Sequence, residues 1–160
     1  DGRTEDIGTF RVSSFPTSHD VPCCGYRVTT PDGHIMALAT DLGVLTPVVQ
    51  ENLAGCSLVA LEANYDSFSL HGGPYPYYLK VRIASDRGHL DNRACAAELL
   101  DLIQDGCKKF ALCHLSQTNN SPELVMTTVY NVLLAAGIQP GRDVLIQTQS
   151  RSEVSPYIEF

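Results

Sequence analysis

The sequence has no long hydrophobic run, and no apolar stretch approaches the roughly 20 residues that a membrane-spanning helix requires. The first ten residues also lack a basic stretch followed by an apolar one, which is the pattern of a secretory signal. Internal repeats, low-complexity segments and linkers are absent too. Because 160 residues are enough to bury a substantial core, these absences favour a single globular domain in the cytoplasm, with no membrane partner.

Cysteine pairs at redox or metal-binding spacing are also missing. The six cysteines include no Cys-x-x-Cys pair and follow no regular spacing, so we expect free, reduced thiols. Cys56, Cys95 and Cys113 fall in apolar stretches, where a free thiol behaves as a small buried hydrophobic group. The cysteines therefore predict core packing rather than chemistry.

Positive charge is scarce. Eleven Lys and Arg residues against 18 Asp and Glu residues give a formal net charge of −7. This balance argues against a broad phosphate-neutralising face, so a phosphate-containing substrate would have to be held locally. The candidate local cations are Lys80, Arg82, Arg87, Lys108 and Lys109. The alternative is that these side chains are simply solvated.

Strands and helices alternate along the chain. Apolar–polar alternation predicts a strand over residues 9–15, and residues 26–29 and 35–39 predict a hairpin around Pro31-Asp32-Gly33. Further strands are predicted over 57–61, 109–113 and 144–147, and helices over 47–55, 91–104 and 122–136, with a short helical stretch ending at 85. Thr46, Asp91 and Ser121 stand at the predicted helix starts. This order predicts an α/β fold in which helices pack over a mostly parallel or mixed sheet.

Three histidines and one aspartate stand beside small or turn-forming residues where we expect strands to end. They are His19, Asp41, His89 and His114. A strand end suits a metal ligand because the strand fixes direction while the loop permits access. Taken singly, each histidine could instead be structural, and Asp41 could be a turn residue. The four together predict half of a hydrolytic metal site.

The segments around these residues resemble a known family. In order they are SHDVPCCGYRV, ATDLG, LVALEANYD, SDRGHLDN and ALCHLSQTNNSPE. They resemble the C-terminal half of a metallo-β-lactamase-fold hydrolase, in particular its YycJ-like subgroup, over nearly the whole chain. The resemblance implies that residues 1–160 are a single domain, half of an αββα sandwich, in which a mixed β-sheet carries helices on one face.

The resemblance also implies roles for the four residues. His19 resembles the histidine that ligates the first metal, Asp41 the carboxylate that bridges two metals, and His114 the last ligand, on the second metal. His89, in the Gly-His-Leu turn, is similar to a histidine that contacts the scissile phosphate or donates a proton in phosphodiesterase members such as ribonuclease Z. His89 is therefore expected to be catalytic rather than a direct ligand.

The chemistry of these residue types agrees with a phosphodiesterase. A carboxylate can bridge two divalent ions, zinc or manganese, which imidazoles hold, and the bridging water becomes the nucleophile near neutral pH. The leaving group then needs a proton, which a histidine such as His89 supplies. Glu62 and Asp66 follow the central strand and are expected to orient the histidines as hydrogen-bond acceptors. Asn64 is a candidate substrate contact.

The chain departs from the family in two ways. It lacks the HxHxDH motif that supplies most ligands in complete members, and Tyr65 stands where the YycJ-like pattern usually has histidine. We therefore expect two metals only in the complete enzyme, and weak or absent metal binding by this chain alone. The remaining ligands would come from a missing N-terminal half or from a second chain, with a homodimer as one form.

Two functions remain open. The first is the C-terminal portion of a metal-dependent hydrolase, a phosphodiesterase or nuclease such as a DNA exonuclease, inactive as the isolated chain. The second is a catalytically dead half-fold that acts as a protein-interaction module.

Other aromatic residues are expected to be structural. Tyr75, Tyr77 and Tyr78 lie in the segment HGGPYPYYL, and packing is their expected role, with stacking on nucleic-acid bases as the alternative. We expect His34 and His71 to be solvated, with a place in the cleft as the alternative for His71.

Overall fold

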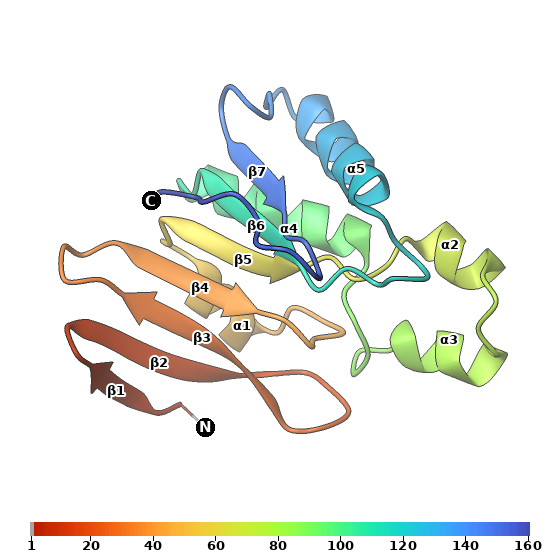
Figure 1. The fold of residues 1–160 in the computed structure, drawn as a ribbon, viewed down its shortest axis with the longest axis horizontal. Coiled ribbons are helices and arrows are strands. Elements are labelled where there is room, and N and C mark those ends of the chain that lie inside the picture. The colour runs from red at the N-terminus through yellow and green to blue at the C-terminus, as the bar shows by residue number, and fades with distance from the viewer. Residues whose placement is uncertain (1) are drawn as a thin grey trace.

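One mixed β-sheet of seven strands organises the chain, and its strand order is the order of the sequence (Figure 1). The structure is a computed structural model and describes residues 2–160. The strands are β1 (Thr4–Ile7), β2 (Phe10–Thr17), β3 (Cys23–Thr29), β4 (Ile35–Ala39), β5 (Leu58–Glu62), β6 (Lys109–Cys113) and β7 (Leu145–Thr148). The helices are α1 (Pro47–Leu53), α2 (Ser67–Gly72), α3 (Tyr77–Ile83), α4 (Asn92–Gln104) and α5 (Pro122–Ala135).

The sheet is antiparallel from β1 to β4 and parallel from β4 to β7. The predicted hairpin is confirmed: Thr29 pairs with Ile35, and Gly33 in the turn has a φ of 89°, which glycine adopts without strain. Because β2 is antiparallel to β3, and β3 to β4, β2 points the same way as the parallel strands. The carboxyl ends of β2, β4, β5 and β6 therefore lie at one edge of the sheet.

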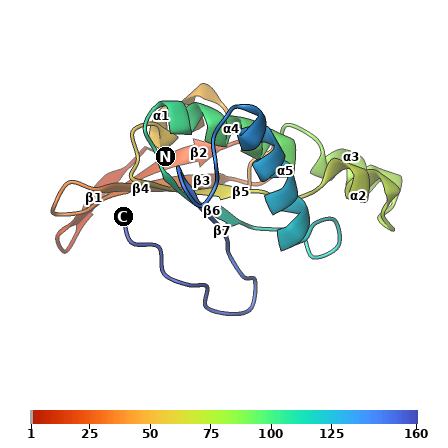
Figure 2. The same ribbon diagram turned by 90° about the horizontal axis from the view of Figure 1, so that it is seen from above.

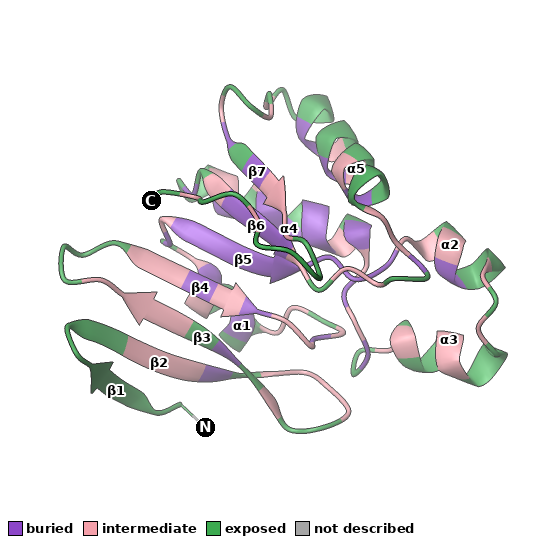
Figure 3. Ribbon diagram, viewed as in Figure 1, coloured by how far each residue is buried: buried purple, intermediate pink, exposed green. Residues whose placement is uncertain are grey.

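Helices α1, α4 and α5 cover one face of the sheet, and the segment after β7 runs along the other (Figure 2). On the helix face, alternate residues of β5 and β6 are fully buried, namely Val59, Leu61, Phe110 and Leu112. Strand β5 is buried along its whole length (Figure 3). The predicted mixed sheet with helices on one face is confirmed. Helices α2 and α3 lie beyond the carboxyl edge of the sheet (Figure 1).

The three predicted helix starts are confirmed. The side chains of Thr46, Asp91 and Ser121 each accept a hydrogen bond from a backbone N–H in the first turn of α1, α4 and α5. A proline follows directly in α1 and α5, where its missing N–H costs no hydrogen bond. Local chemistry therefore sets these boundaries.

Some details of the prediction were wrong. Strand β1 was not predicted because its four residues are all exposed and show no apolar alternation. Helix α2, which ends at Gly72, was also not predicted. All six cysteines are free, as expected, but Cys113 is only half-buried.

No helix within residues 2–160 combines the length and apolar composition that crossing a bilayer requires.

Candidate metal centre

Three of the four predicted residues meet at the carboxyl edge of the sheet. His19 follows β2, Asp41 follows β4 and His114 follows β6. Because these strands run in the same direction, the loops that follow them converge, and residues far apart in the sequence come together.

His89 also lies at the carboxyl edge of the sheet, but it does not follow a strand. The prediction that it ends a strand was wrong. It lies in the connection between α3 and α4. A backbone hydrogen bond from Asn64 N–H to Leu90 O (2.9 Å) ties this connection to the segment after β5. The centroid of the His89 ring lies 5.0 Å from that of His19 and 5.3 Å from that of His114. The structure therefore brings all three histidines into one cluster.

Asp41 lies among the three histidines. Its Oδ1 is 3.7 Å from His19 Nε2 and 3.8 Å from the Nδ1 atoms of both His89 and His114. Asp41 and His114 have φ values of 54° and 57°, and they are the two non-glycine residues with positive φ within residues 2–160. This left-handed conformation costs about 1–2 kcal/mol for a residue with a side chain. Such strain concentrates at functional sites.

Glu62, at the end of β5, holds two of the rings. Its buried carboxylate accepts hydrogen bonds from His89 Nδ1 (2.7 Å) and His114 Nδ1 (2.8 Å) at Oε1, and from the Leu42 N–H (3.0 Å) at Oε2. Burial raises the pKa of Glu62, but the three donors outweigh burial and bring this pKa below its ordinary value. The same hydrogen bond to Glu62 raises the pKa of His114. Glu62 is therefore ionised at neutral pH.

The three histidines share one tautomer. An ionised carboxylate only accepts hydrogen bonds, so the Nδ1 atoms of His89 and His114 must carry the proton. His19 Nδ1 lies 2.8 Å from Gly88 O, a carbonyl oxygen that also only accepts. In the neutral rings, each Nε2 therefore presents a lone pair, which is the form that binds a metal ion.

Asp20 also belongs to the cluster, although its role was not predicted from the sequence. Its Oδ1 lies 3.2 Å from His19 Nε2, is buried, and receives no hydrogen bond from residues 2–160. Its Oδ2 accepts from the Arg82 guanidinium, which lowers the pKa of Asp20. Its place directly after His19 in SHDVP was the one signal that could have found it.

These donors fit a divalent cation. The lone pair of His19 Nε2 faces two carboxylate oxygens, Asp20 Oδ1 at 3.2 Å and Asp41 Oδ1 at 3.7 Å, an arrangement that is repulsive without a positive charge between them. Ligand atoms bound at about 2.1 Å to a tetrahedral zinc ion lie roughly 3.4 Å from one another. The measured separations are close to that spacing.

Two groups of potential ligands lie within 4.8 Å: His19, Asp41 and His89 in one, and Glu62, His89 and His114 in the other. In the second group, both oxygens of Glu62 already accept hydrogen bonds. Glu62 therefore orients the rings, and Asp41 is the carboxylate free to meet a metal ion.

Asn64 lies in the candidate site, whereas Asp66 does not contact the histidines. Asn64 lines a cavity of about 340 Å³ together with His89 and His114, and its Nδ2 donates to His114 O (2.7 Å). Asp66 does not orient a histidine, so that prediction was wrong. Its Oδ1 accepts from the Ser69 N–H (2.8 Å) and caps α2 instead.

Of the basic residues, Lys108 and Lys109 are excluded from the site. They lie at the amino end of β6, at the opposite edge of the sheet. Lys109 Nζ donates to Glu159 O (2.6 Å) in the segment after β7. Of the five predicted cations, Lys80, Arg82 and Arg87 lie on the side of the cluster. Arg151, which was not predicted, lines the same cavity as His89 and His114.

Two glycines allow the loops of the site to approach one another. A Cβ on Gly88 would lie 2.2 Å from Ile83 O, and a Cβ on Gly43 would lie 2.2 Å from Ser85 O. No side chain fits at either position, because real Cβ atoms do not approach backbone oxygens so closely. The close approach at Gly43 holds the loop after Asp41 against the connection that carries His89, and the one at Gly88 holds that connection against the end of α3.

The mixed sheet, with a histidine–carboxylate cluster at its carboxyl edge, matches proteins of the metallo-β-lactamase fold. The solved structure of the metallo-β-lactamase fold protein YhfI from Bacillus subtilis superposes with a TM-score of 0.64, at 14% identity, over 96% of this chain and 51% of that one. No family model matches the chain.

Two curated proteins that are similar in sequence to this chain are exodeoxyribonucleases. Exodeoxyribonuclease WalJ of Streptococcus pneumoniae serotype 2 (strain D39 / NCTC 7466) is 32% identical over 159 residues, which are 99% of this chain and 59% of WalJ. Exodeoxyribonuclease YycJ of Bacillus anthracis is 34% identical over 140 residues, which are 88% of this chain and 53% of YycJ. The chain has the metallo-β-lactamase fold and is similar in sequence to these two exodeoxyribonucleases, of which it spans little more than half the length.

Proposed function

We propose that the chain supplies the proton donor and part of the metal-binding site of a metal-dependent phosphodiesterase that cleaves DNA. The observation that carries this proposal is the buried Glu62 carboxylate, which holds His89 and His114 beside Asp41. A hydrolytic site of this kind needs metal ligands and a proton donor within one cavity, and the cluster offers both. The exodeoxyribonuclease names of the two relatives support DNA as the substrate.

Divalent ions, zinc or manganese, are the cofactor in this proposal. His19, Asp41 and His114 would hold them, with Asp20 as a further oxygen ligand. A divalent ion bound there supplies Lewis acidity to a phosphoryl oxygen and activates water as a nucleophile.

His89 acts on the leaving group. Because Glu62 holds its Nδ1–H, Nε2 is the atom that delivers a proton to the departing oxygen, and the negative charge of Glu62 stabilises the protonated ring. Asn64, in the same cavity, contacts the substrate. Glu62 itself is a positioning residue, since it acts through the two rings.

The remaining metal ligands come from outside these 160 residues in this proposal, either from a preceding part of the protein or from a second chain. With Asp20, the proposed set of His19, Asp41 and His114 gives four ligands for two ions, whereas each zinc ion in a hydrolytic site normally takes three protein ligands. Metal binding by the isolated chain is accordingly weak or absent.

The test compares the protein made from its complete gene with the 160-residue chain, each supplied with Zn²⁺ or Mn²⁺ and an end-labelled DNA. We expect metal-dependent cleavage by the complete product, and His89→Asn should lower kcat by about 100-fold or more while metal content stays the same. His34→Ala is the matched control, because His34 is exposed beside the hairpin turn at the opposite edge of the sheet. Cleavage that survives chelation, or an unchanged kcat in the His89 variant, would contradict the proposal.

A protein-interaction module is the second candidate. The observation in its favour is the sheet face that, within residues 2–160, carries the segment after β7 but no helix (Figure 2). A complete gene product that binds no metal, cleaves no phosphodiester and self-associates on a sizing column would favour this function over hydrolysis.

A further inference from the structure

The segment between β5 and α4 exposes three large aromatic side chains that the proposed function does not use. Phe68 is 88% exposed, Tyr77 81% and Tyr78 74%. The prediction that Tyr77 and Tyr78 pack was therefore wrong, because α3 lies beyond the edge of the sheet and has no buried residue. Aromatic side chains of this size usually bury most of their surface, so three exposed ones within residues 68–78 suggest a binding surface.

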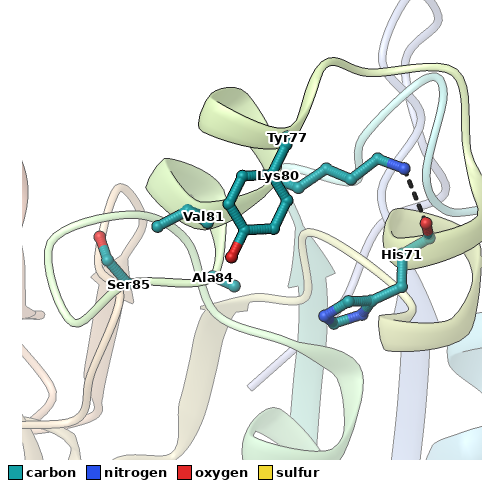
Figure 4. Close-up of a pocket in the computed structure, with 6 residues that line it drawn as sticks. All are labelled: His71, Tyr77, Lys80, Val81, Ala84 and Ser85. Carbon is teal, nitrogen blue, oxygen red and sulfur yellow. Dashed lines mark hydrogen bonds between the residues drawn. The ribbon is translucent and has the colours of Figure 1, made fainter.

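Helix α3 is a wall shared by two cavities. Leu79, Arg82 and Ile83 line the cavity of about 340 Å³ that contains His89 and His114. Tyr77, Lys80 and Val81 of α3, at spacings of three and four, line a second cavity of about 590 Å³, together with Ala84 at the C-cap of the helix. His71 of α2 closes the second cavity (Figure 4). The helix that carries Tyr77 and Tyr78 therefore also lines the candidate catalytic cavity.

The same segment is positively charged on an acidic chain. Residues 67–89 contain three cationic side chains, Lys80, Arg82 and Arg87, and one carboxylate, that of Asp86, while the whole chain carries −7. Arg82 is paired with Asp20, outside this segment. Lys80 Nζ donates to His71 O (2.7 Å) at the second cavity (Figure 4).

Arg87 carries this positive charge to the site itself. Its guanidinium donates to the backbone oxygens of His19 (3.1 Å) and Asp20 (3.3 Å). Positive charge therefore extends from the aromatic surface to the metal ligands, which is the distribution that complements a phosphodiester strand.

We propose that residues 67–89 form a platform for single-stranded DNA, in which Phe68, Tyr77 and Tyr78 stack on unpaired bases and Lys80 contacts a phosphate. This inference rests on the proposed function and names its substrate as a strand with free bases. Aromatic side chains bind every base through its π-face. On a chain with no broad basic surface, stacking adds affinity that the few local cations cannot supply alone.

The experiment measures the affinity of a fluorescent oligothymidylate for the protein by anisotropy, in EDTA, so that binding is independent of cleavage. We expect Tyr77→Ala and Tyr78→Ala each to weaken binding by about fivefold or more. Tyr157→Ala is the matched control, because Tyr157 is 94% exposed in the segment after β7. Thermal unfolding of all variants should match that of the unsubstituted protein, since these side chains are exposed.

An abasic strand of the same length separates stacking from charge. Its binding should be unaffected by the tyrosine substitutions and weakened by Lys80→Ala. The platform is overturned if the unsubstituted protein binds no single-stranded DNA, if the tyrosine variants bind it normally, or if they lose affinity for the abasic strand equally.

Hydrolysis of bis(p-nitrophenyl) phosphate, a diester with no strand to bind, tests the proposed function separately. Retained hydrolysis with weakened strand binding in the Tyr77 variant supports the platform. Retained hydrolysis with unchanged strand binding contradicts the platform but still supports the proposed phosphodiesterase function.

Discussion

The carboxylate of Glu62 accepts a 2.8 Å hydrogen bond from Nδ1 of His114, a residue 52 positions further along the chain. The pairing of β5 with β6 sets Glu62 opposite Cys113, so the two strands end side by side and His114 follows directly. The register of a central strand pair therefore fixes the tautomer of a candidate metal ligand.

Glu62→Ala should lower the free energy of unfolding by about 2–4 kcal/mol, because it leaves buried donors without an acceptor. Glu62→Gln should cost less, since its amide oxygen still accepts one hydrogen bond. Urea unfolding of the metal-free chain measures both. Glu153→Ala, at an exposed position, should change stability by less than about 0.5 kcal/mol. Equal stability of Glu62→Ala and the unsubstituted chain would show that the carboxylate does not hold the rings.

Asp41→Asn and Asp41→Ala should separate the backbone role of this residue from its ligand role. Asparagine tolerates the left-handed conformation, so Asp41→Asn should unfold at nearly the original temperature, whereas Asp41→Ala should lose about 1 kcal/mol. Both should bind metal at least about tenfold more weakly in the complete gene product, by calorimetric titration. Undiminished metal affinity in Asp41→Asn would rule out the carboxylate as a ligand.

Gly88→Ala should displace the connection that carries His89, because its new Cβ would meet Ile83 O at 2.2 Å. We expect a loss of about 1–3 kcal/mol in stability and a fall in kcat in the complete gene product. Gly72→Ala provides the control, since nothing lies within 4 Å of a Cβ there and its φ is not positive. Thermal unfolding and a DNA cleavage assay measure the two effects, and equal behaviour of the two variants would contradict the close-approach argument.

Iodoacetamide at pH 8 should modify Cys24 well before Cys56 or Cys113. Cys24 is exposed, whereas burial raises the pKa of Cys56 and Cys113 to about 11, so that roughly 0.1% of either is thiolate at pH 8. Only the thiolate reacts, so modification of these two residues should increase as the pH rises towards 11. Mass spectrometry of the digested protein follows each site, and rapid labelling of Cys56 at pH 8 would show that it is not buried.

Most helices and strands could be predicted because their signals are local. The turn at Gly33 and the caps at Thr46, Asp91 and Ser121 act within a few residues of one another. Strand β1 could not be predicted, since an exposed edge strand carries no apolar alternation and exists through its pairing with β2.

The sequence by itself determined that His19, Asp41 and His114 follow strands, because strand boundaries and turn residues are local features. Only the tertiary structure decided that His89 joins them from a helix connection, and that Glu62, rather than the next acidic residue along the chain, holds the rings. Hydrogen bonds between distant residues depend on strand direction, register and the close approach of loops, none of which is encoded in the spacing of residues along the chain.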